Sequence, residues 1–128
     1  MEEKKDFYKL LEDISNQDCR YKVDGYEFIM QALHFTQGRL KKDGHVTGKE
    51  LTEGVKDFAI EQYGPMAQTV LAHWGITKTE DIGNIVFNLI DKKILSKTDE
   101  DSLQDFKDIY DFSAAFGNIW ESNPIKEI

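Results

Sequence analysis

His45 is the residue whose type and setting most suggest chemistry in this chain. It stands in the loop 43–48, with a glycine on either side that would let a ligand approach the backbone closely. Imidazole is the side chain best suited to move a proton near neutral pH. A small enzyme centred on His45, with Glu50 or Asp81 as its partner, is therefore one hypothesis. The alternative is a structural histidine that hydrogen-bonds across a helix junction.

The remaining residues with reactive or metal-binding side chains form no recognisable motif. His34, His45 and His73 are widely spaced, and the sequence has neither a Cys-x-x-Cys nor a His-Glu-x-x-His pattern. Cys19 is the single cysteine, which excludes an internal disulfide and a multi-cysteine zinc site. It has no activating base beside it in the sequence. We therefore expect no metal, no cofactor and no catalytic set.

An acidic segment near the C-terminal end is the second feature that could carry function. This segment contains one basic residue, Lys107, and six acidic ones, namely Asp99, Glu100, Asp101, Asp105, Asp108 and Asp111. An EF-hand loop would need a central glycine and a terminal glutamate, and both are missing. Two interpretations stay open, a solvated acidic face and a contact surface for a basic partner.

Composition limits the class of protein. The 128 residues are enough for a single domain over 1–128, and 40% of them are hydrophobic. Sixteen basic against 24 acidic residues give a net charge of −8, which repels nucleic acids and anionic membranes at long range. The sequence has no apolar leader and no run of about 18 apolar residues that would span a bilayer. We expect a cytoplasmic protein with no membrane partner.

Apolar spacing and helix-capping pairs predict five or six helices. Phe7, Leu10, Leu11 and Ile14 share one helical face over about residues 3–15. Three capping boxes open later helices, namely Asp24 with Glu27, Thr47 with Glu50, and Thr77 with Glu80. Gly44, Gly64 and Gly75 are expected to end helices, with Pro65 opening a short one. The helix from Thr77 to Lys93 has the strongest apolar stripe.

Beyond that helix the pattern favours a small β-hairpin. Ile94-Leu95 would start a strand, Thr98–Ser102 would turn, and 105–112 alternates as a second strand, although a helical stripe over 103–110 is an open alternative. Helices followed by a hairpin are the order of a winged-helix unit. We therefore predict a mainly α fold (α+β) that is winged-helix-like in its second half, with a last short helix over 113–120 and a polar tail over about 122–128.

A nucleic-acid-binding regulator is the second function hypothesis. The helix Thr77–Lys93 would expose Lys78, Asn84, Asn88, Lys92 and Lys93, but its acids balance its lysines. Arg39, Lys41, Lys42 and Lys49 could add a basic patch. DNA binders usually neutralise several phosphates, so the net charge and the acidic hairpin tip disfavour this use.

Several motifs together resemble a family of small bacterial proteins of unknown function, found mainly in planctomycete and verrucomicrobial genomes. They span about residues 21–116 and are the runs 44–54, 63–67, 74–81, 85–89 and 110–112. The family pattern has Arg before the loop histidine and Phe at the position of Tyr63, whereas this chain has Gly44 and Tyr63. The resemblance implies a compact single bacterial domain, and it implies no activity, ligand or catalytic residue.

The leading hypothesis is a non-enzymatic binding or adaptor module. An acidic surface favours fast association with a basic protein, or with a complex that contains one such as a ribosomal or nucleoid assembly. The predicted interaction surface joins the hairpin to the preceding helix and comprises His45, Lys78, Asn84, Asn88, Lys92, Lys93, Asp99, Glu100, Asp101 and Asp105.

Overall fold

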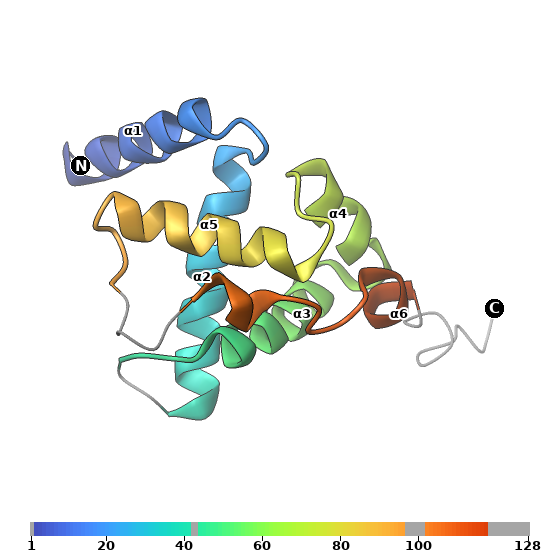
Figure 1. The fold of residues 1–128 in the computed structure, drawn as a ribbon. Helices are drawn as coiled ribbons and strands as arrows, with labels where there is room; N and C mark the ends of the chain where they lie inside the picture. Colours follow the sequence, from blue (N-terminus) through green and yellow to red (C-terminus); the bar gives the residue numbers. More distant parts are fainter. Residues whose placement is uncertain (1, 42–43, 97–101, 118–128) are drawn as a thin grey trace.

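The computed structural model describes residues 2–41, 44–96 and 102–117, and these residues form helices and no strand (Figure 1). The predicted mainly helical fold is confirmed. The elements are α1 (Glu2–Gln17), α2 (Val23–Leu40), α3 (Gly48–Tyr63), the 3₁₀ helix η1 (Gly64–Met66), α4 (Ala67–His73), α5 (Thr79–Asp91), the 3₁₀ helix η2 (Leu103–Phe106) and α6 (Phe112–Gly117). No helix in this part of the chain is long and apolar enough to cross a membrane.

Helix α2 is the central element, and α1, α3 and α5 all pack against it (Figure 1). Its core-facing residues include Tyr26, Ile29 and Ala32, each with no exposed surface. The contact with α3 is close because Gly54 faces Thr36. A Cβ on Gly54 would lie 1.8 Å from the Thr36 hydroxyl oxygen, so only glycine allows the two helices to approach this closely.

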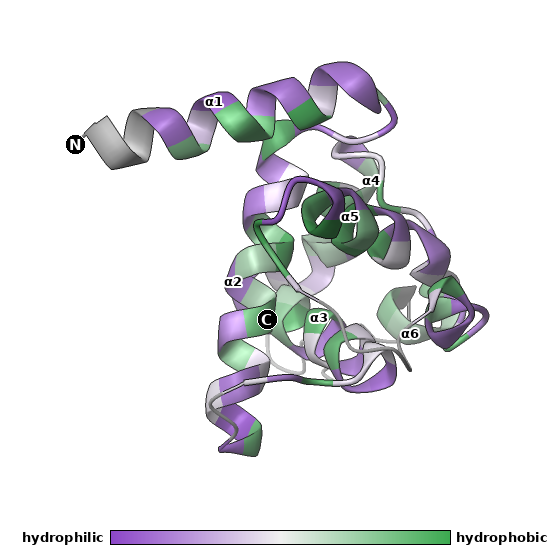
Figure 2. Cartoon of the chain, turned by 60° about the vertical axis from the view of Figure 1, so that its left-hand side comes forward, coloured by the Kyte–Doolittle hydropathy of each residue, from purple (hydrophilic) through white to green (hydrophobic). Residues whose placement is uncertain are grey.

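Helix α5 carries the most apolar of the predicted stripes, and it is surrounded by the rest of the fold. Ile82, Ile85 and Leu89 are fully buried, and α5 contacts α2, α3 and η2. Figure 2 looks nearly along this helix and shows its apolar surface enclosed by the neighbouring helices. The position of α5 therefore decides which of its polar residues can reach solvent.

Two of the predicted helix junctions are confirmed in detail. Thr47 caps α3, because its hydroxyl oxygen accepts from the Glu50 backbone N–H at 3.1 Å while the Glu50 carboxylate accepts from the Thr47 N–H at 2.8 Å. Gly75 follows α4 with φ of +95°. A side chain there would be strained, and a Cβ would lie 1.9 Å from the Arg20 carbonyl oxygen.

Three predicted helix ends are wrong. Helix α2 begins at Val23, after Lys22 and without a side-chain cap, so Asp24 and Glu27 form no capping box. Its end takes the left-handed conformation at Lys41, with φ of +58°, and not at Gly44. Helix α5 begins at Thr79, and Asp81 instead of Glu80 binds the backbone N–H groups before it, because Asp81 is held inward by a buried partner.

The predicted hairpin is not found in the described residues. Residues 92–93 follow α5 as a turn and 94–95 as a bend, and η2 over 103–106 overlaps the start of the strand expected over 105–112. The reason is local capping and packing: the Asp105 carboxylate accepts from the Ser102 N–H at 3.0 Å, and Phe106 is buried at 4% exposure. The rest of the predicted turn at Thr98–Ser102 lies outside the described residues.

Helix α6 takes the place of the predicted helix over 113–120. It covers Phe112–Gly117, with Phe112 and Phe116 buried in the core. The end of the predicted helix and the tail over 122–128 lie outside the described residues.

Candidate binding pocket beside His45

A pocket of about 320 Å³ opens beside His45, between α2, α3, α5 and η2. The loop 44–48 supplies one edge, and residues 95–96 supply another. The described residues that line it are Leu33, Gln37, Gly44, His45, Val46, Thr47, Gly48, Leu51, Val86, Phe87, Ile90, Leu95, Ser96 and Phe106. His45, the residue that the sequence singled out, therefore lines this pocket.

The interior of this pocket is apolar. Val46, Leu51, Val86 and Phe106 are buried and form part of the core, and the other apolar lining residues are half-buried. Phe106 and Phe87 meet edge to face, with ring centroids 6.5 Å apart and planes at 88°. Such a surface binds apolar groups, because their burial removes water from both sides.

Two glycines create the place for Phe106. A Cβ on Gly83 of α5 would lie 2.7 Å from the Phe106 ring, and a Cβ on Gly48 of α3 would lie 3.1 Å from it. The ring therefore closes the pocket wall because both helices lack a side chain where they face it. Sequence patterns did not indicate this role of Phe106. The one signal for it is a glycine in each of two predicted helices, Gly48 and Gly83.

Two polar side chains at the edge of the pocket form hydrogen bonds within the protein. The Gln37 side-chain amide donates to the Gly44 carbonyl at 2.7 Å, which holds the loop 44–48 against α2. The Thr47 hydroxyl oxygen is used in capping α3. His45 is exposed, and it is the one titratable residue among the described lining residues. The edge of the pocket is thus polar, whereas its interior supplies an apolar contact area.

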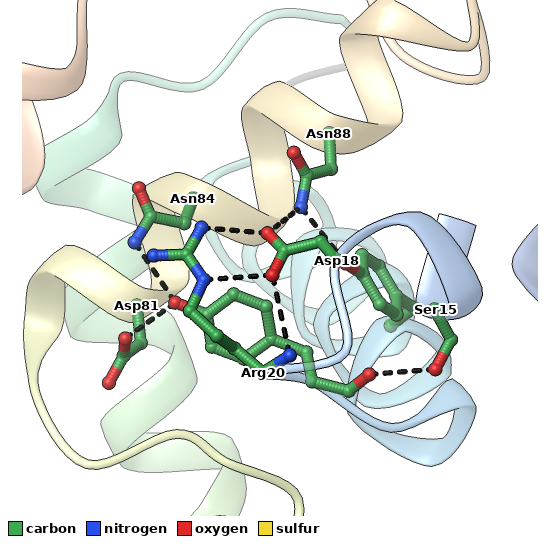
Figure 3. Close-up of polar contacts among 8 residues, drawn as sticks. Ser15, Asp18, Arg20, Asp81, Asn84 and Asn88 are labelled. Carbon is green, nitrogen blue, oxygen red and sulfur yellow. Dashed lines mark hydrogen bonds and ion pairs between the residues drawn. The ribbon is translucent and has the colours of Figure 1, made fainter.

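A polar network lies along a different side of α5 (Figure 3). The Tyr21 hydroxyl donates to Asp81 Oδ1 at 2.5 Å and accepts from the Asn84 amide at 2.9 Å. The Asn88 amide donates to Asp18 at 2.8 Å and to the Tyr26 hydroxyl at 3.0 Å. These bonds hold α5 against the segment that joins α1 to α2 and against the start of α2.

Asp18 and Tyr21 have shifted pKa values in this network. The hydrogen bonds from Arg20, at 2.8 and 2.7 Å, hold the pKa of the Asp18 carboxyl at about 2, below its ordinary 3.8. Burial is the main reason that the pKa of Tyr21 is raised, and the hydrogen bond to Asp81 adds to it. The network is therefore built from a charged carboxylate and neutral phenols.

The predicted interaction residues that the structure describes lie in different surroundings. His45 lies on the pocket, whereas Asn84 and Asn88 are half-buried and bound to tyrosine hydroxyls. Lys78 and Lys93 are exposed, Lys92 is half-buried, and Asp105 accepts from the Ser102 N–H. Asp99, Glu100 and Asp101 lie outside the described residues.

The proposed partners of His45 have other roles. Asp81 is 7% exposed, and it accepts from Tyr21, from the Thr77 N–H and hydroxyl, and from the Lys78 N–H. Glu50 belongs to the capping box of α3. Neither lines the pocket, and no three His, Cys, Asp or Glu residues in the described part of the chain are placed to hold a metal ion.

Comparison with known proteins gives no relative for the chain. No family model, curated protein or solved structure matches it.

Proposed function

We propose that this chain is a non-enzymatic protein-binding module whose pocket beside His45 receives a large apolar side chain of a partner. The main observation in support is the apolar interior of the pocket, with Phe106, Phe87 and Leu51 in its walls. Ligand pockets usually range from roughly 300 to 1,000 Å³. A volume of about 320 Å³ suits one anchoring side chain better than a whole cofactor.

The composition of the lining supports binding over catalysis. Most of the described lining side chains are apolar, and they are buried or half-buried. Shape and apolar burial are the properties that this pocket offers.

Net charge supports a basic partner. The chain carries −8, and long-range attraction speeds association with a protein of opposite charge even where it adds little affinity. The nucleic-acid alternative has less support, because Asn84 and Asn88 of the expected reading helix donate to tyrosines. A winged-helix-like use would also need a hairpin, and the described residues contain none.

A pair of leucine substitutions tests the proposal. Leu33→Trp fills the pocket, whereas Leu10→Trp adds the same side chain to an exposed position of α1 that does not line it. We expect the wild-type chain and the Leu10→Trp control to capture the same partner from the native host, and Leu33→Trp to lose it. Equal capture by all three, with Leu33→Trp folded by circular dichroism, would overturn the proposal.

A further inference from the structure

The side of α2 away from the pocket carries a continuous row of aromatic rings. Phe35 is two residues from the pocket residue Leu33, which places it on nearly the opposite side of the helix. Its ring centroid is 5.0 Å from that of Phe58, Phe58 is 5.3 Å from Phe28, and Phe28 is 5.5 Å from Trp74. Tyr63 lies 6.0 Å from both Phe28 and Trp74, so α2, α3 and the residue that follows α4 contribute to one row.

Most of these rings keep part of their surface in solvent. Phe28 is buried at 2% exposure, whereas Phe35, Phe58, Tyr63 and Trp74 are half-buried; we call these four residues the aromatic face. Met66 follows Tyr63 in η1 with 55% of its surface exposed. Aromatic residues and methionine are enriched at the centres of protein interfaces, and scattered surface residues would not be expected to form a row.

Helix α3 lines this face with carboxylates. Glu53, Asp57 and Glu61 follow at four-residue spacing, which puts them on one stripe of the helix; we call them the acidic stripe. Glu61 is three residues after Phe58 and is its neighbour on the helix surface, and the Asp57 carboxylate binds Arg39, whose guanidinium lies over Phe35. A carboxylate beside an aromatic ring favours a cation that can contact both.

The molecule already holds one arginine in this way. The guanidinium of Arg39 lies 5.2 Å from the centroid of Phe35, and its Nη1 is 2.5 Å from Asp57 Oδ2. Both partners of this ion pair remain about 40% exposed, with values of 40% and 43%. Exposed pairs of this kind contribute little to stability. The contact therefore shows that this surface can bind a guanidinium group, and the fold does not depend on it.

We propose that the aromatic face and the acidic stripe together bind an arginine-bearing amphipathic segment of a protein partner. Arginines of that segment stack on the part-exposed rings and pair with Glu61 and, in place of Arg39, with Asp57, while its apolar side chains cover Phe58 and Trp74. This surface is separate from the pocket beside His45. The chain would therefore hold two protein segments at once, on opposite sides of α2, as an adaptor requires.

The full chain with Trp120→Phe provides a direct readout, because Trp74 is then its only tryptophan. The probe is a synthetic amphipathic peptide of arginine and leucine, titrated at low salt and compared with the same peptide carrying glutamate for arginine. We expect the fluorescence of Trp74 to change with the arginine peptide alone. In this background Asp57→Asn/Glu61→Gln should weaken binding about fivefold to tenfold, the effect of losing two charge pairs.

The matched control removes two charges elsewhere. Glu12→Gln/Asp13→Asn alters exposed acids of α1 and should change the affinity less than about twofold. An equal loss in both double variants would mean attraction by net charge alone and would overturn the proposal. An absence of peptide binding at low salt would also overturn it. Calorimetry on Leu33→Trp should give unchanged peptide affinity, which separates this surface from the pocket.

Discussion

The two sides of α5 differ in polarity and in packing. Asp81, Asn84 and Asn88 face the segment joining α1 to α2, where their polar groups are bonded to Tyr21, Tyr26 and Asp18. Val86, Phe87 and Ile90 face the pocket, where packing leaves about 320 Å³ open. The described residues contain no buried side-chain nitrogen or oxygen without a hydrogen-bond partner.

The difference teaches which side is available for binding. A network whose polar groups bind one another fixes one arrangement of the helix. The side chains that line an apolar pocket lack van der Waals contacts on the open side, and a ligand could supply these contacts. We therefore assign positioning of α5 to the network and binding to the pocket. Substitutions on each side should separate these roles.

Phe106→Ala is expected to have the largest effect, because it removes a ring packed between Gly48 and Gly83. Truncation of a buried phenylalanine costs about 3–5 kcal/mol of unfolding free energy. Urea unfolding followed by circular dichroism measures it. Leu103→Ala, in the same 3₁₀ helix at 48% exposure, is the control and should cost less than about 1 kcal/mol. Similar losses in both would contradict the role given to Phe106.

Asp81→Ala tests the opposite side of α5. The substitution removes the acceptor for Tyr21 and for the backbone before α5, leaving several donors unpaired. We expect a loss of about 2–3 kcal/mol, measured by the same urea titration. Asp91→Ala, at the exposed end of α5, should change stability by less than about 0.5 kcal/mol. A neutral Asp81→Ala would show that the network does not position the helix.

Tyr21→Phe should have a smaller effect that depends on pH. It removes one hydrogen bond to a carboxylate, worth about 1.5–3 kcal/mol. The raised pKa of Tyr21 means that the wild-type contribution is complete below pH 10 and is lost as pH rises further. Unfolding between pH 8 and 11 should thus show a steeper alkaline loss for wild type than for Tyr21→Phe. Tyr8→Phe, at 45% exposure, is the control and should change the slope less, because solvent screens the interaction with Glu27 that raises the pKa of Tyr8.

Asp18→Asn should have the smallest effect, because Asp18 and Arg20 lie near the surface. We expect less than about 1 kcal/mol at neutral pH. The lowered pKa of Asp18 stabilises the fold above about pH 4, and this contribution disappears as pH falls toward 2. Urea midpoints between pH 2 and 5 should be less pH-dependent in Asp18→Asn than in wild type. An Asp13→Asn control that flattens the profile equally would exclude a specific role for Asp18.

Local signals in the sequence predicted much of the helical fold. The Thr47–Glu50 box fixes the start of α3 through neighbouring atoms, so a short motif was enough to find it. The apolar stripe of α5 was equally clear. The box assigned to Thr77 and Glu80 was wrong because a distant residue, Tyr21, draws Asp81 inward. Pairwise spacing along one helix carries no information about such a partner.

The pocket could be predicted only in part. His45 stood out through its type and its flanking glycines, and it does line the pocket. Phe106 was assigned to a strand because Phe106, Tyr110 and Phe112 alternate along the chain. Its burial against Gly48 and Gly83 depends on tertiary contacts that override this alternation. Asn84 and Asn88 looked exposed on one helix and are covered by the segment before α2. The family resemblance stays a prediction.

The most direct test of the central claim is an NMR titration of the isotope-labelled chain with indole, which stands in for an anchoring tryptophan side chain. The account predicts saturable shifts confined to amides around the pocket, such as those of Val46, Gly48 and Phe87. These shifts should be lost in Leu33→Trp and retained in Leu10→Trp. Shifts that cluster elsewhere, or that persist when Leu33→Trp fills the pocket, would contradict the assignment of this pocket as the binding site.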